Sequence, residues 1–172
     1  MLTCQRDQFD MPREICFFNV AAFSPLPKRV QEVAHAAVSR KAQPWLLDAD
    51  IIPIVNERAR KAAAQLIQAE PADVALVSSV GYGVATAGKV LDIPRGSRVL
   101  VLANDHTAPV LEWMSRAKAG GFTVETVERP AGASWTEAIL DAIDRPGAAP
   151  LALVSISNVH WSDGGIVDLD TV

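Results

Sequence analysis

Glycines, hydroxyl residues and a lysine gather in one stretch of the chain, ALVSSVGYGVATAGKVL, at residues 75–91. Within it GVATAGK, at 83–89, has the spacing G-x-x-x-x-G-K of a loop that binds nucleoside triphosphates. That loop needs a Ser or Thr directly after the lysine to hold magnesium, and here Val90 follows Lys89. We therefore expect these glycines to lie on a helix, and a triphosphatase is the disfavoured interpretation.

A better candidate for an anion site lies a few residues upstream, in SSVGYG. An apolar, β-branched run at 73–79 predicts a strand, and the chain then turns into a helix through Gly81. Free N–H groups and the helix dipole at such a turn favour an anion, and glycine lets the backbone approach it closely. The alternative is a strand–helix turn that binds nothing.

Two further strand ends carry polar side chains. His106 follows a predicted strand at 97–104, and Ser157, Asn158 and His160 follow another at 150–157. A histidine in such a loop can stack on a flat ring, although a loop histidine without function is the commoner case. Because ligands bind at the carboxyl ends of parallel strands, the three loops together predict one site better than any motif alone.

The elements that must position these loops alternate along the second part of the chain. Predicted strands recur about every 25 residues, with helices between them, which is typical of βαβ units in a mainly parallel sheet. Their continuous apolar character indicates a sheet covered on both faces, in a three-layer αβα arrangement. The strands are expected at 73–79, 97–104, 122–129 and 150–157, and the helices at 28–42, 55–71, 82–93, 108–121 and 134–144.

Composition excludes several classes of protein. The chain has 172 residues and 49% hydrophobic residues, so a packed core is feasible. Its formal net charge is -4 and no basic stripe stands out, which argues against a nucleic-acid binder. Its two cysteines form no C-x-x-C pair, so neither a zinc site nor a disulfide framework is expected. Without a signal peptide or a membrane-spanning run, the cytoplasm is the simplest compartment.

Taken in order, these loops resemble the large domain of the pyridoxal-phosphate-dependent enzymes of fold type I. The similarity is to the class V aminotransferase family, which includes cysteine desulfurases, kynureninases and isopenicillin-N-epimerase-like proteins. It runs from about Phe17 to Val172, and four segments carry it: FFNVAAFSPLPKRV, ALVSSVGYGVATA, NDHTAPVLEW and SISNVHWSDGGIVDL.

The resemblance implies roles for five residues. Ser79, Val80 and Gly81 would hold the phosphate of pyridoxal 5'-phosphate, His106 would stack on its ring, and Asn158 would bond its phenolic oxygen. The family often has hydroxyl residues where this chain has Val80 and Gly81, so backbone N–H groups and Ser79 would make the contacts. His160 competes with Asn158 for the polar role.

The family's Schiff-base lysine and the Asp that pairs with the pyridine nitrogen lie further along the chain than Val172. We therefore expect an N-terminal fragment, with a helical segment at 1–70 and an incomplete cofactor-binding domain at 71–172, inactive by itself. The parent would be a homodimer acting on an amino acid by transamination, desulfuration or other lyase chemistry, or epimerisation. The alternative is a cofactor-free α/β binding or interaction module, a degenerate relative of the enzyme.

Overall fold

The computed structural model describes residues 3–172 and divides the chain into two compact units, Met1–Ala75 and Leu76–Val172. The first unit is helical. It contains the helices α1 (Lys28–Lys41) and α2 (Ile51–Ile67) and the 3-10 turns Arg6–Gln8, Pro44–Leu46 and Pro71–Asp73.

Both predicted helices of the first unit are present. α1 begins directly after Pro27, where a missing N–H costs nothing. α2 begins four residues before the predicted start, at Ile51, and ends at Ile67 rather than at the proline further on. It ends there because Gln68 takes a left-handed conformation, with φ 56°, which a helix cannot continue.

The apolar face predicted for α1 is not buried. Val30, Val33 and Val38 are all exposed, and within residues 3–75 Ala64 of α2 is the one buried hydrophobic side chain. The spacing of these valines is correct for an amphipathic helix, but the unit supplies no surface against which the face can pack.

The second unit is built on three parallel strands in the order β2-β1-β3. This confirms the expected parallel sheet, because three of the four predicted strands form it. Its elements are α3 (Val80–Val90), β1 (Arg98–Leu102), α4 (Ala108–Gly120), β2 (Thr123–Val127), α5 (Trp135–Ile143) and β3 (Leu151–Val154).

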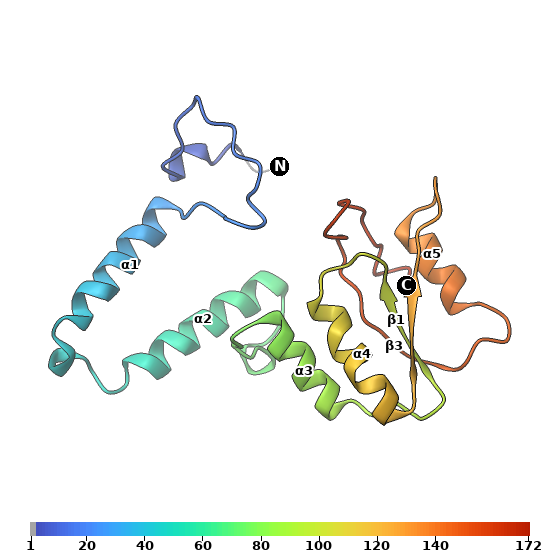
Figure 1. Ribbon diagram of the computed structural model, residues 1–172. Helices are drawn as coiled ribbons and strands as arrows, with labels where there is room; N and C mark the ends of the chain where they lie inside the picture. The colour runs from blue at the N-terminus through green and yellow to red at the C-terminus, as the bar shows by residue number, and fades with distance from the viewer. Residues whose placement is uncertain (1–2) are drawn as a thin grey trace. The chain divides into compact units, whose positions relative to one another are not determined.

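Helices cover both faces of this sheet, as Figure 1 shows. Every residue of the central strand β1 is buried. On one face Leu100 and Leu102 pack in a cluster with Trp135 and Ile139 of α5. On the other, Val99 and Val101 pack with Trp113 of α4, and Val84 of α3 joins the same cluster. The alternation of side chains along a strand therefore produces three layers.

The predicted strand at 73–79 is wrong. Val74 and Ser79 have extended backbones, but no residue from 74 to 79 belongs to a strand, and Leu76 and Val77 are exposed. An apolar β-branched run becomes a strand only when a neighbouring strand accepts its hydrogen bonds. Within residues 3–172 no strand pairs with it.

Local signals at the helix ends are confirmed. Ser134 and Glu137 form the predicted capping box at the start of α5, where each side chain accepts the other residue's backbone N–H. α4 ends at Gly121, whose φ of 74° is the left-handed conformation that glycine adopts without strain.

A buried charged group, the guanidinium of Arg98, links several elements of the second unit. The Arg98 guanidinium donates to the carbonyl oxygens of Ala142, Ile143 and Ala149 at 2.9, 3.0 and 2.7 Å, and to Glu125 Oε2 at 3.0 Å. Arg145 also pairs with the Glu125 carboxylate. Strand β1 is thereby linked to the carboxyl end of α5, whose last carbonyls would otherwise lack donors.

Candidate functional site

The amino end of α3 is arranged as an anion site requires. Ser79 is its N-cap, and Ser79 Oγ accepts the N–H of Tyr82 at 3.1 Å. Within residues 3–172 no protein acceptor bonds the N–H groups of Val80 and Gly81. Gly81 is exposed and presents bare backbone, so these two N–H groups are open to a ligand.

A second helix begins beside them. Gly81 shares a shallow hollow of about 300 Å³ with Thr107 and Ala108, the residues at which α4 starts. The hollow also includes Glu112, but this carboxylate is paired with Arg116 at 3.1 Å. Two helix amino ends with their positive partial charges therefore lie at this hollow.

His106 lies in the loop that leads into α4. Its Nδ1 accepts the N–H of Ala108 at 3.3 Å, so in the neutral ring the proton is on Nε2. Its own backbone N–H donates to Asp105 Oδ1 at 2.7 Å. The imidazole is exposed and lies edge-to-face with the indole of Trp161, with ring centroids 5.6 Å apart and planes at 87°.

The turn after β3 reaches the same loop. Ser157 Oγ donates to Asp105 Oδ1 at 3.4 Å, so the second and third predicted loops are neighbours. Asn158 is exposed, and its backbone carbonyl accepts the N–H of Val167 at 2.8 Å. Its side-chain amide has no hydrogen bond within the described residues, which leaves it free to bind a ligand.

His160 is the residue that competed with Asn158 for the bond to the phenolic oxygen. It is buried in the core, and both of its ring nitrogens have partners there. It is 1% exposed and stacks on Trp135 with centroids 4.4 Å apart. Its Nε2 lies 2.9 Å from the carbonyl of Ala103, and its Nδ1 lies 3.1 Å from Asp163 Oδ1. His160 is therefore a structural residue, and Asn158 remains the candidate ligand of this turn.

The pKa of Asp163 is lowered. The largest cause is the backbone N–H of Gly165, which donates to Oδ1 at 2.8 Å, and the indole N–H of Trp135 and the charges of Arg129 and His160 act in the same direction. A carboxylate held in this way stays ionised and closes the turn that carries Asn158.

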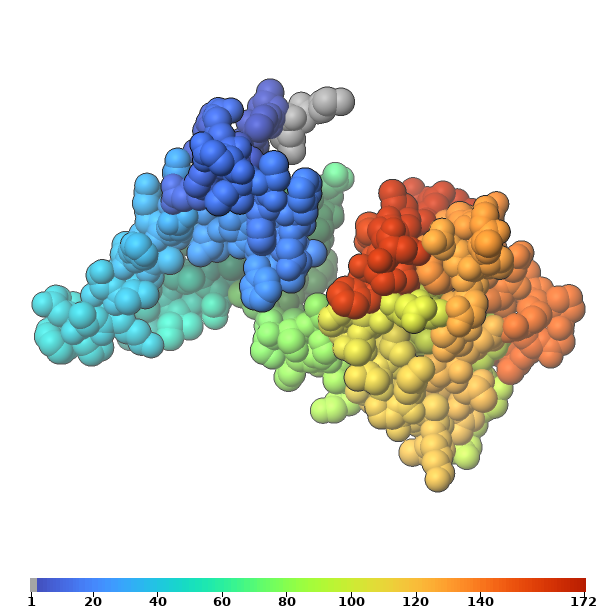
Figure 2. All heavy atoms as spheres, turned by 45° about the horizontal axis from the view of Figure 1, so that its top comes forward, coloured from blue at the N-terminus to red at the C-terminus, as the bar shows by residue number. Residues whose placement is uncertain are grey.

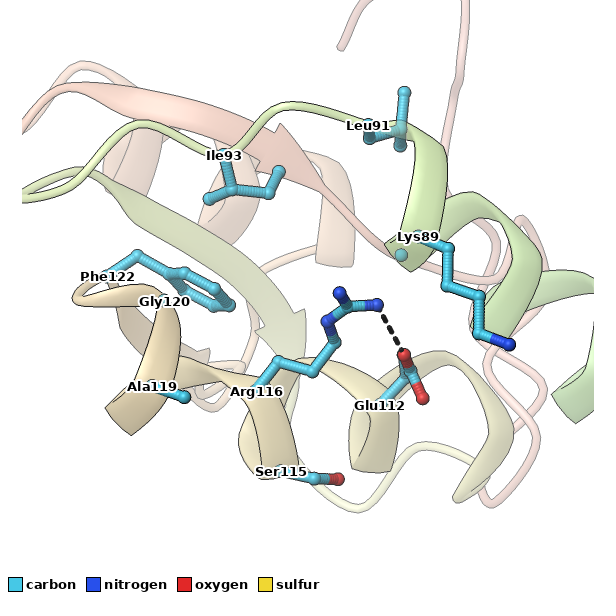
Figure 3. A pocket seen from close by; sticks show the side chains of 10 residues that line it. Lys89, Leu91, Ile93, Glu112, Ser115, Arg116, Ala119, Gly120 and Phe122 are labelled. Atoms are coloured by element: carbon cyan, nitrogen blue, oxygen red, sulfur yellow. Dashed lines mark hydrogen bonds and ion pairs between the residues drawn. The ribbon is translucent and has the colours of Figure 1, made fainter.

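The stretch GVATAGK lies on α3, which confirms the helix interpretation. Lys89 is in the last turn of α3, roughly 13 Å along the helix from Val80 at 1.5 Å per residue. It lines a different and larger hollow of about 670 Å³, shown in Figure 3, with Phe122 and the Glu112–Arg116 pair. This hollow lies where β2 begins, away from the strand ends that carry His106 and Asn158.

Within residues 3–172 no group of three or more His, Cys, Asp or Glu side chains could hold a metal ion. In the same part of the chain, no helix combines the length and the apolar character needed to cross a membrane.

No protein-family model matches the chain, and no curated protein does. Several solved structures, however, match the chain. One is a mutant of C-DES with glycine covalently linked to its pyridoxal-phosphate cofactor, which is 18% identical with a TM-score of 0.77. That match covers 98% of this chain and 44% of C-DES.

Two other solved structures agree. C-DES, a cystine C–S lyase, in complex with its product cysteine persulfide is 18% identical with a TM-score of 0.69, covering 86% of this chain and 39% of that one. The apo cysteine desulfurase of Thermococcus onnurineus NA1 is 19% identical with a TM-score of 0.75. That match covers 96% of this chain and 42% of the desulfurase.

These likenesses show the fold. The chain has the fold of part of the fold type I pyridoxal-phosphate enzymes, as the sequence predicted. It spans less than half the length of each of these structures.

Trp161 and Thr107 are residues that the sequence did not single out. Thr107 lines the hollow that it shares with Gly81, and Trp161 contacts His106. A tryptophan in the polar turn three residues after Asn158 was the signal that could have pointed to Trp161, because a large apolar ring in a turn usually has a partner.

Proposed function

We propose that this chain supplies the part of a pyridoxal-phosphate-dependent enzyme that binds and orients the cofactor for reaction with an amino acid. The observation that carries the proposal is the meeting of two helix amino ends, at Gly81 and Ala108, beside the exposed ring of His106. A phosphate and an aromatic ring on one small molecule match these two features.

The residues at the site fit the group. The N–H groups of Val80 and Gly81 would donate to phosphate oxygens, together with the hydroxyl of Ser79. His106 would pack on the pyridine ring, and the free amide of Asn158 would bond its phenolic oxygen. Pyridoxal phosphate, when bound, supplies an electron sink for carbanion chemistry, while the protein provides binding and orientation.

The catalytic lysine would come from outside these 172 residues. The second unit has the lysines Lys89 and Lys118, and both lie in the last turn of their helices, at the ends remote from Gly81 and Ala108. A side chain there cannot reach a ligand at the helix amino ends. The second unit therefore has no lysine within reach of this site, and we propose that the chain alone has neither transaminase nor lyase activity.

The substrate is proposed as an amino acid, and cysteine is the first to test. The support is the nature of the similar structures, which are a cystine C–S lyase and a cysteine desulfurase. Transamination and epimerisation remain open, because residues outside the chain would select among the reactions.

A homodimeric parent is the companion proposal. Its support is the exposed apolar face of α1 and the exposed Ile52, Ile54 and Val55 of α2, which need a covering surface. Light scattering on the longest protein encoded by the gene tests it, since a monomer at micromolar concentration would contradict it.

Binding is tested with the 172-residue chain and pyridoxal 5'-phosphate, followed by the phosphorus NMR signal of the ligand. Addition of the chain should broaden and shift that signal. Pyridoxal, which lacks the phosphate and has no phosphorus signal, should displace the bound ligand only weakly when it is added as a competitor. Gly81→Asp is the site variant, because it places a carboxylate beside the two free N–H groups. Lys89→Ala is the matched control, because it changes α3 at its other end.

Three results would contradict the proposal. An unchanged phosphorus signal would favour the cofactor-free binding module. Equal binding by the Gly81→Asp variant would remove the amino end of α3 from the site. Tight binding of ATP with magnesium, abolished by Lys89→Ala, would restore the triphosphatase.

A further inference from the structure

The loop that carries His106 is held from one side by the turn that follows β3. Three consecutive residues of the loop each accept a hydrogen bond from that turn. His160 Nε2 lies 2.9 Å from the Ala103 carbonyl, and Trp161 Nε1 donates to the Asn104 carbonyl at 2.9 Å. Ser157 Oγ donates to Asp105 Oδ1 at 3.4 Å. We name residues 157–161 the clamp.

The clamp also contacts a residue with a left-handed backbone. Asn104 has a φ of 56°, a conformation that asparagine adopts more readily than most residues other than glycine. The Trp161 indole donates to the carbonyl of this residue, so it stabilises one of the conformations that Asn104 can adopt. Figure 2 shows the segment after β3, in red, beside the yellow segment that contains the loop and α4.

Trp161 contacts the loop a second time, through its ring. The indole and the His106 imidazole lie edge-to-face with centroids 5.6 Å apart. The indole is 66% exposed, so burial in the core does not explain its position. Its position is explained by one hydrogen bond to Asn104 and one ring contact with His106.

We propose that Trp161 is a positioning residue that sets the orientation of the His106 imidazole. Its N–H holds Asn104 in the left-handed conformation that aims the loop, and its ring restricts the rotation of the imidazole. Ala108 acts from the other side, through the bond from its N–H to His106 Nδ1. This inference rests on the proposed function for its purpose, because an oriented imidazole is what stacking on a cofactor ring requires.

The orientation is measured without any ligand, by NMR of the carbon-bound ring protons of His106 in the 172-residue chain. The chain has three histidines, and His106→Gln assigns the signal. Trp161→Leu removes the hydrogen bond and the ring contact, so the His106 signals should move toward those of an unrestrained imidazole. Trp161→Phe keeps an aromatic ring but has no N–H, so it should shift the Asn104 amide while keeping more of the His106 shift.

Val159→Ala is the matched control, because Val159 is an exposed apolar residue of the same turn that donates none of the three side-chain bonds. A second measurement needs no substitution. The Trp161 indole N–H should exchange with solvent more slowly than that of Trp45, which is exposed and has no protein acceptor within residues 3–172. This keeps the inference testable even if Trp161→Leu fails to fold.

With pyridoxal 5'-phosphate as the probe, Trp161→Leu should weaken binding by about two- to tenfold, the worth of one lost aromatic pair. Two results overturn the inference: His106 signals that move no further in Trp161→Leu than in Val159→Ala, or an indole N–H of Trp161 that exchanges as fast as that of Trp45. A restrained His106 in a chain that binds no pyridoxal phosphate would instead overturn the proposed function and leave the positioning role intact.

Discussion

Arg98 is the residue at which a single change should cost the second unit most stability. Its side chain is 5% exposed, and it donates four hydrogen bonds, three of them to backbone carbonyls. Arg98→Met keeps a long apolar side chain but leaves the carbonyls of Ala142 and Ile143 without their donor. It also leaves the Glu125 carboxylate with Arg145 as its remaining partner.

The size of the effect follows from these contacts. Hydrogen bonds to a charged group contribute about 1.5–3 kcal/mol each, so four would sum to roughly 6–12 kcal/mol. That sum is too large, because the carbonyls at the end of α5 can accept water instead. Removal of one partner from a buried ion pair costs about 3–5 kcal/mol, and we expect Arg98→Met to fall in this range.

Urea unfolding followed by tryptophan fluorescence measures this loss. Trp113 and Trp135 are both buried in the second unit, so their emission reports its unfolding. With a slope near 2 kcal/mol per molar urea, a loss of about 4 kcal/mol lowers the midpoint by roughly 2 M.

Arg145→Ala is the matched control for this measurement. It removes the other arginine from Glu125, but the Arg145 side chain is 52% exposed. An exposed pair contributes about 0–1 kcal/mol, so the midpoint should move little. Equal losses in the two variants would show that burial of Arg98 does not decide its contribution, and would refute the reasoning.

Three other changes test the local structure. Because the pKa of Asp163 is lowered from 3.8, its contribution to stability is present above that value and lost as the pH falls through the lower folded value. Asp163→Asn should therefore flatten the acid limb of a plot of urea midpoint against pH, and an unaltered limb would contradict the assignment. Ser79→Ala should cost about 0.5–2 kcal/mol through loss of the N-cap, measured by urea unfolding, whereas Ser78→Ala, outside the cap, should not. Gly96→Ala should cost about 1–2 kcal/mol in the same assay, because φ is positive there and the added Cβ meets nothing within 4 Å. Gly88→Ala in helical backbone should cost less, since its Cβ meets the ends of the flexible Glu112 and Arg116 side chains. A larger loss for Gly88→Ala than for Gly96→Ala would mean that the space around the Cβ, and not φ, decides the cost.

The sequence alone predicted most of the second unit. Continuous apolar runs separated by helical patterns indicated a parallel sheet, and the strands at 98–102, 123–127 and 151–154 form it. The capping box at Ser134 and the glycine end of α4 were readable because each depends on residues a few positions apart. The helix expected from Tyr82 begins two residues earlier, at Val80, and ends at Val90.

The predictions that were wrong concern long-range pairing. The run at 73–79 has the composition of a strand, but no strand within residues 3–172 accepts its hydrogen bonds. The valines of α1 have helical spacing, but no surface of their unit covers them. Local propensity specifies what a segment can form, and the presence of a partner decides whether it is buried or paired.

The candidate site also has features that the sequence predicted and features that only the tertiary structure decided. The sequence predicted that His106 and Asn158 would follow strand ends and that Gly81 would lie near the start of a helix, because turn and strand signals are local. Only the tertiary structure decided that His160 is buried against Trp135 and that Trp161 lies on His106. The bonds from 160 to 103 and from 161 to 104 each join residues 57 positions apart. A contact of that separation depends on how β1 and β3 pair, and no pattern within a single segment contains that information.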